Sequence, residues 1–317
     1  MNKPNFHFFF ASHEDEELIL QLQRASFPHT KEKFTHEWYN WLFRDCPLGS
    51  SRTYIAYDVP EGKTAGSNSF RPIQLRFNHE EVLASFSHST NTRQAYRGRG
   101  LFTILVGKQA PPREALLGVP ISVGNPNANS YRGFIKAGYV PVCELSELVK
   151  RSFKKQKHIC TRINEFDWNI DRLVNLNRNN FKFTTIKDHH FLNWRFSMPE
   201  EDYTFYVLHP EYWVAAGYIV LKKHTSNGVR KAHIVDMQAE TEKNCKELLK
   251  AAEIYAYRCD ELTWNSNEFD YYRQWFLDEG YEARDTHGSL VVKFNDGVER
   301  KLPEGNIYWS YADNDVY

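Results

Sequence analysis

The chain has 317 residues, about twice the ~150 residues of a usual domain, so we expect two domains rather than one. Hydrophobic residues make up 41% and charged residues 25% of the chain, which excludes wholesale disorder. Forty basic and forty acidic residues cancel, and this balance argues against a nucleic-acid-binding or membrane-binding surface, because both need a basic excess.

Cysteine usage and the length of the apolar runs indicate the compartment. No apolar run approaches the ~20 residues of a membrane span. The five cysteines are odd in number, and no two of them form a Cys-x-x-Cys pair. This pattern fits neither a disulfide framework nor a zinc ribbon, and it favours reduced thiols in the cytoplasm. We expect no metal site, because His189-His190 lacks a third ligand at useful spacing.

Two short patterns occur twice in the chain. Residues 40–43 (Asn-Trp-Leu-Phe) are echoed by residues 193–196 (Asn-Trp-Arg-Phe), an offset of 193 − 40 = 153. Residues 134–139 (Phe-Ile-Lys-Ala-Gly-Tyr) are echoed by residues 276–281 (Phe-Leu-Asp-Glu-Gly-Tyr), an offset of 276 − 134 = 142. The echoes keep the same order at nearly the same separation, which indicates a duplication.

Strand-forming runs and glycine-capped helices alternate along both copies. The predicted elements are strands at 53–57, 82–90 and 119–123, a helix at 103–106 ended by Pro111-Pro112, a helix from Asn129 to Gly138, strands at 203–208 and 212–221, and a helix from Asp270 to Gly280. This order predicts an α/β (α+β) fold of two tandem domains, each a mixed, mostly antiparallel sheet flanked by helices. We expect the domains to span 1–153 and 154–317, joined at the basic stretch 150–155, which we interpret as a solvated linker.

The segment after the strand at 82–90 carries the most informative chemistry. A strand, the glycine-rich turn Arg97-Gly98-Arg99-Gly100 and a helix start follow one another there. Such a turn presents several backbone N–H groups to one point, and the helix dipole adds partial positive charge. Glycines let the backbone approach a ligand closely, and the two arginines add charge-assisted contacts. The segment therefore predicts a site for a phosphate or pyrophosphate.

The spacing Arg97-x-x-Gly100-x-Phe102 resembles the pyrophosphate loop of the GCN5-related N-acetyltransferase (GNAT) superfamily, usually Gln/Arg-x-x-Gly-x-Gly/Ala. The strand at 119–123, the Asn-rich residues 125–129 and the helix ending at residues 134–139 follow in that family's order. The resemblance covers roughly residues 75 to 145. It departs at Phe102, where the family has a small residue, so the local packing of the loop is expected to differ.

The resemblance implies that acyl-CoA is the co-substrate and lies in a V-shaped gap between strands four and five. Its pyrophosphate would meet the amides of residues 97–103, and Asn125 and Asn129 would bound its pantetheine or acyl group. The residues expected to bind it are Arg97, Gly98, Arg99, Gly100, Leu101, Phe102, Thr103, Asn125, Asn129 and Phe134. Residues 240–245 of the second copy carry no glycine and include acids, so only the first domain is expected to bind CoA, the second being acceptor-binding or structural.

Catalysis is expected at the end of the strand at 82–90, where the family places its thioester. His88 is the candidate base, with a hydrogen-bonded core histidine as the alternative. A backbone N–H at Ser89 or Thr90 would hold the oxyanion of a direct attack by the amine. Phe134 stands where many members have a tyrosine that protonates the departing thiolate. A thiol pKa near ~8.5 still leaves a tolerable leaving group.

The tandem arrangement resembles bacterial N-acyltransferases of sugar-nucleotide pathways, particularly those that acylate a dTDP-3-amino-3,6-dideoxyhexose. The resemblance implies an acetyl or hydroxybutanoyl donor and a role in O-antigen, lipopolysaccharide or other surface polysaccharide synthesis. An amine with a pKa near ~8 is roughly 10% neutral at pH 7, whereas a lysine near ~10.4 is almost wholly protonated, which favours the sugar. The alternatives are a lysine, polyamine or aminoglycoside acceptor, or a non-catalytic acyl-CoA-binding module.

Aromatic and basic residues near the repeated Asn-Trp pattern are the candidates for binding the acceptor. Trp38, Trp41, Arg44 and Arg195 have the chemistry to stack on a nucleotide and to pair with its phosphates. Core packing is the alternative, because Trp38 and Trp41 share one helical face and Trp41 and Trp194 occupy equivalent places in both copies. The sequence leaves the oligomeric state open.

Overall fold

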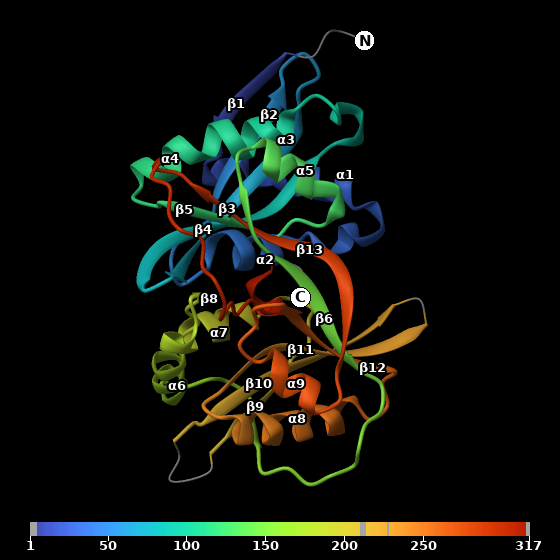
Figure 1. The fold of residues 1–317 in the computed structure, drawn as a ribbon. Helices are drawn as coiled ribbons and strands as arrows, with labels where there is room; N and C mark the ends of the chain where they lie inside the picture. The colour runs from blue at the N-terminus through green and yellow to red at the C-terminus, as the bar shows by residue number, and fades with distance from the viewer. Residues whose placement is uncertain (1–4, 210–213, 227, 315–317) are drawn as a thin grey trace.

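A computed structural model describes residues 5–209, 214–226 and 228–314. All strands within these ranges belong to one 13-stranded sheet in the order β1-β2-β3-β4-β5-β13-β6-β12-β11-β10-β9-β7, with β8 paired to β3 (Figure 1). The parallel pairs in the described chain are β4–β5 and β11–β12, and the other pairs are antiparallel. The fold class predicted from the sequence, a mixed and mostly antiparallel sheet flanked by helices, is confirmed.

The first half of the chain builds the upper part of the molecule in Figure 1. Its strands are β1 (Phe6–Phe10), β2 (Arg52–Asp58), β3 (Lys63–Phe77), β4 (Glu80–Thr92), β5 (Ile121–Gly124) and β6 (Val140–Lys150), and its helices are α1 (Glu16–Ser26), α2 (His36–Tyr39), α3 (Leu101–Ile104), α4 (Ala110–Leu116) and α5 (Ala128–Lys136). A 3-10 segment, η2 (Pro28–Lys33), links α1 to α2, and π-helical turns η3 (Asn40–Arg44) and η5 (Leu105–Gln109) follow α2 and α3.

The second half builds the lower part. Its strands are β7 (Thr161–Ile163), β8 (Phe183–Thr185), β9 (Thr204–Leu208), β10 (Gly217–Ser226), β11 (Val229–Ala239), β12 (Glu261–Asn267) and β13 (Glu282–Phe294), and its helices are α6 (Asn169–Asn177), α7 (His189–Arg195), α8 (Glu242–Ala256) and α9 (Arg273–Asp278). Part of the strand predicted at 212–221 lies outside the described residues. No helix in the described ranges combines the length and the apolar character that a membrane crossing needs.

Helix boundaries follow the local chemistry with one exception. Gly138 and Gly280 have φ of 85° and 82°, the left-handed conformation expected of glycines that end helices. Pro111 and Pro112 do not end the helix after the glycine-rich turn, which corrects the prediction. They occupy the first turn of α4, where a missing N–H costs nothing, because the π-helical turn η5 precedes them.

The last strand of each half crosses to the other half. β6, which follows α5, pairs with β12 through Leu145–Lys150, and β13, which follows α9, pairs with β5 through Val291–Phe294. β6 and β13 also pair with each other and run from one half to the other (Figure 1). The sheet of the first half is therefore completed by a strand from the second. The domain boundary near residue 153 stays a prediction, because β13 belongs to the second half of the sequence but pairs with β5 of the first half.

A reciprocal tryptophan pair marks the contact between the two copies. Trp41 Nε1 donates to the Trp194 carbonyl at 2.8 Å, and Trp194 Nε1 donates to the Trp41 carbonyl at 2.8 Å. The two indole rings stack with their centroids 5.8 Å apart, and both residues are buried. Two equivalent residues that make the same bond to each other indicate an approximate two-fold axis between the halves.

We expect Trp194→Phe to lower the free energy of unfolding by about 2 kcal/mol, from one lost hydrogen bond and a small cavity. Urea unfolding of Trp194→Phe, Trp41→Phe and the double variant measures this effect, and the two changes should not add, because the residues touch. Trp168→Phe is the control, since Trp168 is 71% exposed. Additive effects would contradict the coupling.

Candidate functional site

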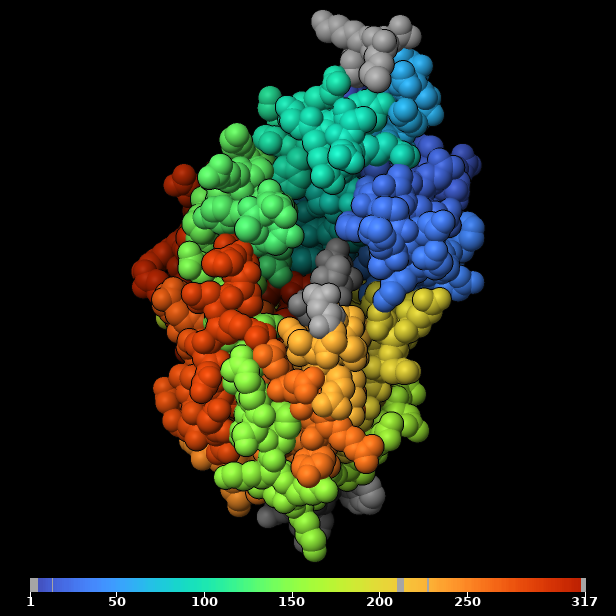
Figure 2. All heavy atoms as spheres, turned by 90° about the vertical axis from the view of Figure 1, so that its right-hand side faces the viewer, coloured from blue at the N-terminus to red at the C-terminus, as the bar shows by residue number. Residues whose placement is uncertain are grey.

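A cavity of about 1000 Å³ opens where β4 and β5 separate. The two strands pair only from Ala84–Phe86 to Ile121–Val123, and β4 continues past this point along the cavity floor. Figure 2 shows the surface hollowed between the blue N-terminal helices and the green segment that contains α5. The predicted residues that line the cavity are Trp38, His88, Ser89, Thr90, Arg97, Gly98, Gly100, Leu101, Phe102, Thr103, Asn125, Asn129 and Phe134. Tertiary structure therefore gathers most of the predicted site.

A β-bulge shapes the floor of the cavity. Ser69 pairs with His88 and Ser67 with Asn91, so two residues of β4, Ser89 and Thr90, lie opposite one residue of β3. Ser89 has φ of 47°, in the left-handed region that non-glycine residues seldom occupy. The bulge turns the β4 backbone at the point where the sequence predicted the oxyanion site. Sequence reasoning gave no signal for it.

His88 lies on the cavity floor but is only 2% exposed. Its Nε2 is 3.0 Å from Ser51 Oγ, and its Nδ1 is 3.1 Å from Ser89 Oγ. Burial, assisted by the positive charge of Arg71, holds the pKa of His88 well below its usual value, so the ring is neutral at pH 7. A neutral imidazole beside a serine hydroxyl is able to accept a proton, and the same contacts also suit a structural histidine.

The glycine-rich turn borders the cavity at the start of a helical run. Gly98 and Gly100 have φ of 78° and 75°, and no atom lies within 4 Å of a Cβ built on either residue. Gly100 is the N-cap of α3, so the first amides of the helix follow it directly. Arg97 lines the cavity, while Arg99 lies outside its lining with its guanidinium 5.9 Å from the Tyr96 ring. This arrangement suits a phosphate group.

The two phenylalanines that depart from the family pattern are accommodated by glycines. A Cβ on Gly133 would lie 2.7 Å from the Phe102 ring, and a Cβ on Gly124 would lie 2.6 Å from the Phe134 ring. The two rings meet edge to face at 5.0 Å. Gly133 thus makes room for a large residue where the family loop has a small one, and Phe134 brings no hydroxyl to the cavity.

The asparagines after β5 have different roles. Asn127 caps α5, because its Oδ1 accepts from the amides of Asn129 and Ser130 at 3.0 and 3.2 Å. Asn125 donates from Nδ2 to Oδ1 of Asn314, which fixes the Asn125 side chain at the cavity wall. Asn129 is exposed and lines the cavity.

Two cations on α5 were missed by the sequence reasoning. Arg132 and Lys136 line the cavity together with Arg97, and α5 contacts α3, the helix that follows the glycine-rich turn. They are spaced i, i+4, so they share one helical face, and this spacing was the available signal. These three basic residues make the cavity lining suited to an anion.

Three of the four residues predicted to bind an acceptor do not line the cavity. Arg195 is fully buried, and its Nε and Nη2 donate to the carbonyls of Ala312 and Asn314. Trp41 packs against Trp194, and Arg44 pairs with Glu16 at 2.7 Å. Core packing, the alternative that the sequence left open for the tryptophans, describes Trp41, and Arg195 is also in the interior. Only Trp38 lies at the cavity.

The opposite wall of the cavity comes from α1, η2 and the second half of the chain. Met198 and Glu201 follow α7 and line the cavity with Phe34 and Trp38. Met198 and Glu201 are more than 150 residues from Phe34 and Trp38 in the chain, so no local sequence pattern could indicate that they share a wall. Among the described lining residues, Glu201 carries the one carboxylate.

Glu201 is already paired. It contacts Lys33 Nζ at 3.0 Å and Lys222 Nζ at 2.8 Å. Burial alone would raise the pKa of Glu201, but hydrogen bonds from Lys222 and Lys33 outweigh burial and hold the pKa below its usual value. This wall therefore has no net negative charge to attract a polycation.

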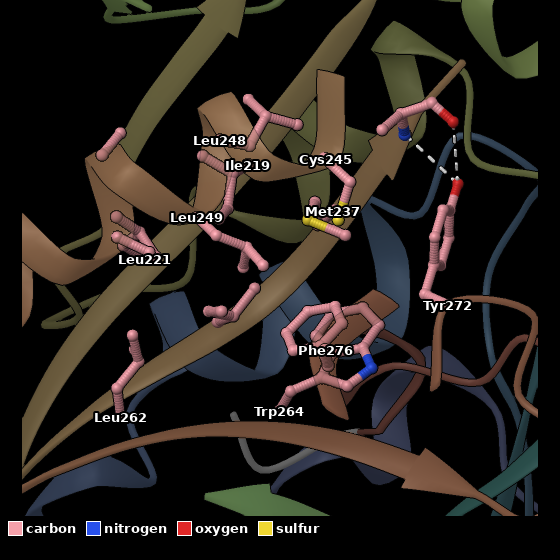
Figure 3. Packing of buried hydrophobic residues seen from close by; sticks show 14 of the residues in the cluster. Ile219, Leu221, Met237, Cys245, Leu248, Leu249, Leu262, Trp264, Tyr272 and Phe276 are labelled. Atoms are coloured by element: carbon pink, nitrogen blue, oxygen red, sulfur yellow. Dashed lines mark hydrogen bonds between the residues drawn. The ribbon is translucent and has the colours of Figure 1, made fainter. Parts of the chain in front are cut away.

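The corresponding gap in the second half is filled by the protein itself. β11 pairs with β12 only up to Ile234, and beyond that point two tyrosines bind its edge. Tyr308 donates to the Met237 carbonyl at 2.8 Å. The Tyr272 hydroxyl accepts from the Ala239 amide at 3.2 Å, as Figure 3 shows. Both tyrosines are fully buried, so this strand edge is closed to a ligand.

In the described part of the chain, no group of three or more His, Cys, Asp or Glu side chains is placed to hold a metal ion.

Comparisons with known proteins agree with the geometry. Residues 10–140 match the model of the acetyltransferase (GNAT) domain family. A GCN5-related N-acetyltransferase from Anabaena variabilis has a TM-score of 0.70 at 15% identity, covering 92% of this chain and 73% of its own. A probable N-acyltransferase from Enterococcus faecalis has a TM-score of 0.68 at 13% identity, with the same coverage. No curated protein sequence matches the chain.

N-myristoyltransferase from Saccharomyces cerevisiae, solved with myristoyl-CoA bound, has a TM-score of 0.65 at 13% identity, covering 93% of this chain and 85% of its own. Such identities establish a shared fold, and the chemistry must be argued from the site. The domain match at residues 10–140 supports an acyl-CoA-dependent N-acyltransferase, and the solved structures add the shared fold.

Proposed function

We propose that the chain is an acyl-CoA-dependent N-acyltransferase that acylates the amine of a nucleotide-linked amino sugar. The observation that carries the proposal is the gap between β4 and β5, bordered by the glycine-rich turn and lined from both halves of the chain. A dTDP-3-amino-3,6-dideoxyhexose as acceptor, an acetyl or hydroxybutanoyl donor, a role in O-antigen synthesis and a cytoplasmic location are the finer parts of the proposal. The five free cysteines fit that location.

The CoA moiety would lie along the unpaired edge of β4. An extended chain of amides such as pantetheine binds such an edge as an added strand does. Its pyrophosphate would meet the turn at Gly98 and Gly100, where the backbone is open. Arg97, Arg132 and Lys136 would supply positive charge beside the phosphates. The second half offers no such edge, so we propose one CoA site per chain.

Transfer would occur by direct attack of the acceptor amine on the thioester carbonyl. The C–N bond forms, the C–S bond breaks, and the amine proton leaves through a base toward the departing thiolate. His88 is the proposed base, since its ring is neutral and Ser89 connects it to the cavity. Backbone N–H groups at the bulge of Ser89 and Thr90 would stabilise the oxyanion.

The opposite wall of the cavity has no net negative charge, and this supports a sugar acceptor over a polycation. Polyamines, aminoglycosides and lysine side chains need an acidic cleft, and the Glu201 carboxylate is compensated by Lys33 and Lys222. The aromatic rings of Phe34 and Trp38, with centroids 5.0 Å apart, line the cavity and give it an apolar surface for a base or a sugar ring. A non-catalytic acyl-CoA-binding module is the second candidate, because Phe134 provides no acid for the thiolate.

A thiol-release assay separates these candidates. Acetyl-CoA and 3-hydroxybutanoyl-CoA are tested against dTDP-3-amino-3,6-dideoxygalactose, spermidine, an aminoglycoside and a lysine peptide. Among these acceptors, we expect only the sugar nucleotide to cause thiol release from the acyl-CoA. Turnover of the cations would favour the other acceptors, and CoA binding without turnover of any amine would favour the binding module.

A further inference from the structure

Two polar side chains of α1 face the cavity with unused hydrogen-bonding capacity. Gln23 lines the cavity and is 2% exposed, and its Nε2 is buried with no hydrogen-bond partner in the described chain. Ser26 also lines the cavity, and its Oγ is likewise buried with no hydrogen-bond partner in the described chain. The two residues are spaced i, i+3, so they share one face of α1. A buried polar group without a partner costs about 1–3 kcal/mol, which a bound ligand would recover.

The surroundings of this pair are firmly held. Arg24 binds the Phe34 carbonyl through Nε and Nη2 at 3.1 and 2.8 Å, which ties α1 to the end of η2. Phe34 packs edge to face on Trp38 with ring centroids 5.0 Å apart, and both rings line the same cavity as the two polar groups. Both polar groups thus belong to a shaped, partly apolar recess of the cavity.

The chemistry of the recess indicates its ligand. Gln23 and Ser26 are neutral, and the nearby carboxylate of Glu201 is bound by Lys33 and Lys222. The pair carries no charge that would select an ionised group, and its chemistry matches a hydroxyl, which accepts from an amide N–H and exchanges a hydrogen bond with a serine. An apolar face beside hydroxyl-binding groups is the pattern that suits a sugar ring.

We infer that Gln23 and Ser26 form the subsite for the hydroxyl groups of the amine-bearing sugar ring of the acceptor. The inference rests on the proposed function for the orientation of the substrate. α1 packs against β4, whose residues 87–92 line the same cavity. The ring that carries the amine must reach this floor, so its hydroxyls are the acceptor groups nearest to α1. Gln23 and Ser26 therefore select the acceptor without taking part in the chemistry.

Calorimetry tests the subsite independently of turnover. dTDP-3-amino-3,6-dideoxygalactose and dTDP alone are titrated into the chain saturated with CoA. Gln23→Met keeps the side-chain length but removes the amide, and we expect it to weaken binding of the sugar nucleotide roughly tenfold. Ser26→Ala should weaken it several-fold. Both variants should bind dTDP and CoA as the parent does. Gln21→Met on the exposed face of α1 is the matched control and should change nothing.

Each other outcome has a defined meaning. The inference is overturned if the parent does not bind the sugar nucleotide, if Gln23→Met and Ser26→Ala bind it like the parent, or if dTDP is weakened equally. Should Gln23→Met not fold, Ser26→Ala alone decides the matter. If both variants weaken binding as expected but the parent releases no thiol, the proposed catalysis fails and the subsite stands.

Discussion

Gly100→Val should abolish acetyl-CoA binding while the chain still unfolds cooperatively. Gly100 has φ of 75°, and a β-branched residue there costs about 1–2 kcal/mol or forces the turn to reshape. A reshaped turn no longer aims its amides at one point. Losing two hydrogen bonds to a charged phosphate, each worth about 1.5–3 kcal/mol, raises the Kd at least 100-fold. Calorimetry with acetyl-CoA measures this, and the parent should bind one molecule per chain.

Gly118→Val is the matched control for this change. Gly118 has φ of 73°, is exposed, meets no atom within 4 Å and does not line the cavity. It therefore carries the same backbone strain without touching the proposed site. We expect a similar loss of stability and an unchanged Kd. Retained affinity in Gly100→Val, or equal loss in both variants, would remove the turn from the binding site.

His88→Gln should lower kcat by about 10²–10⁴ and leave the KM for acetyl-CoA unchanged. The base form of His88 dominates at pH 7, because burial and Arg71 keep its pKa well below the usual value. Acidification protonates the ring, so the kcat of the parent should show a His88 limb well below about pH 6.5, the usual histidine value, in addition to the loss that protonation of the acceptor amine causes in parent and variant alike. This acidic limb should disappear in His88→Gln. Initial rates of thiol release between pH 5 and 9 provide the measurement.

His233→Gln separates catalysis from packing. His233 is also buried, pairs with Thr263 at 2.7 Å, and has a pKa that burial lowers to about 4, but it lies outside the cavity. Its replacement should cost stability and keep kcat within about twofold of the parent. If His88→Gln keeps a near-normal kcat, His88 is a core histidine, as its contacts with Ser51 and Ser89 also permit.

Local patterns sufficed for most of the elements and for the glycine-rich turn that borders the cavity. The strand predicted at 82–90 is β4, and the glycine-ended helices stop at Gly138 and Gly280, because side-chain alternation and left-handed glycines act within a few residues. The turn at residues 97–100 also depends on left-handed glycines, Gly98 and Gly100, and it borders the cavity. The helix end predicted at Pro111-Pro112 was wrong, because the π-helical turn η5 precedes α4 and both prolines lie in the first turn of α4.

What the sequence determined by itself was therefore the fold class and the glycine-rich turn, which rest on interactions between near neighbours, while the internal duplication stays a prediction from the repeated patterns. Tertiary structure alone decided the bulge at Ser89, the insertion of β13 between β5 and β6, and the far wall built by Gln23 and Glu201. It also placed Trp41 and Arg195 in the interior. These features depend on which distant segments pack together, and packing free energy is set by shape and burial across the whole sheet rather than by local spacing.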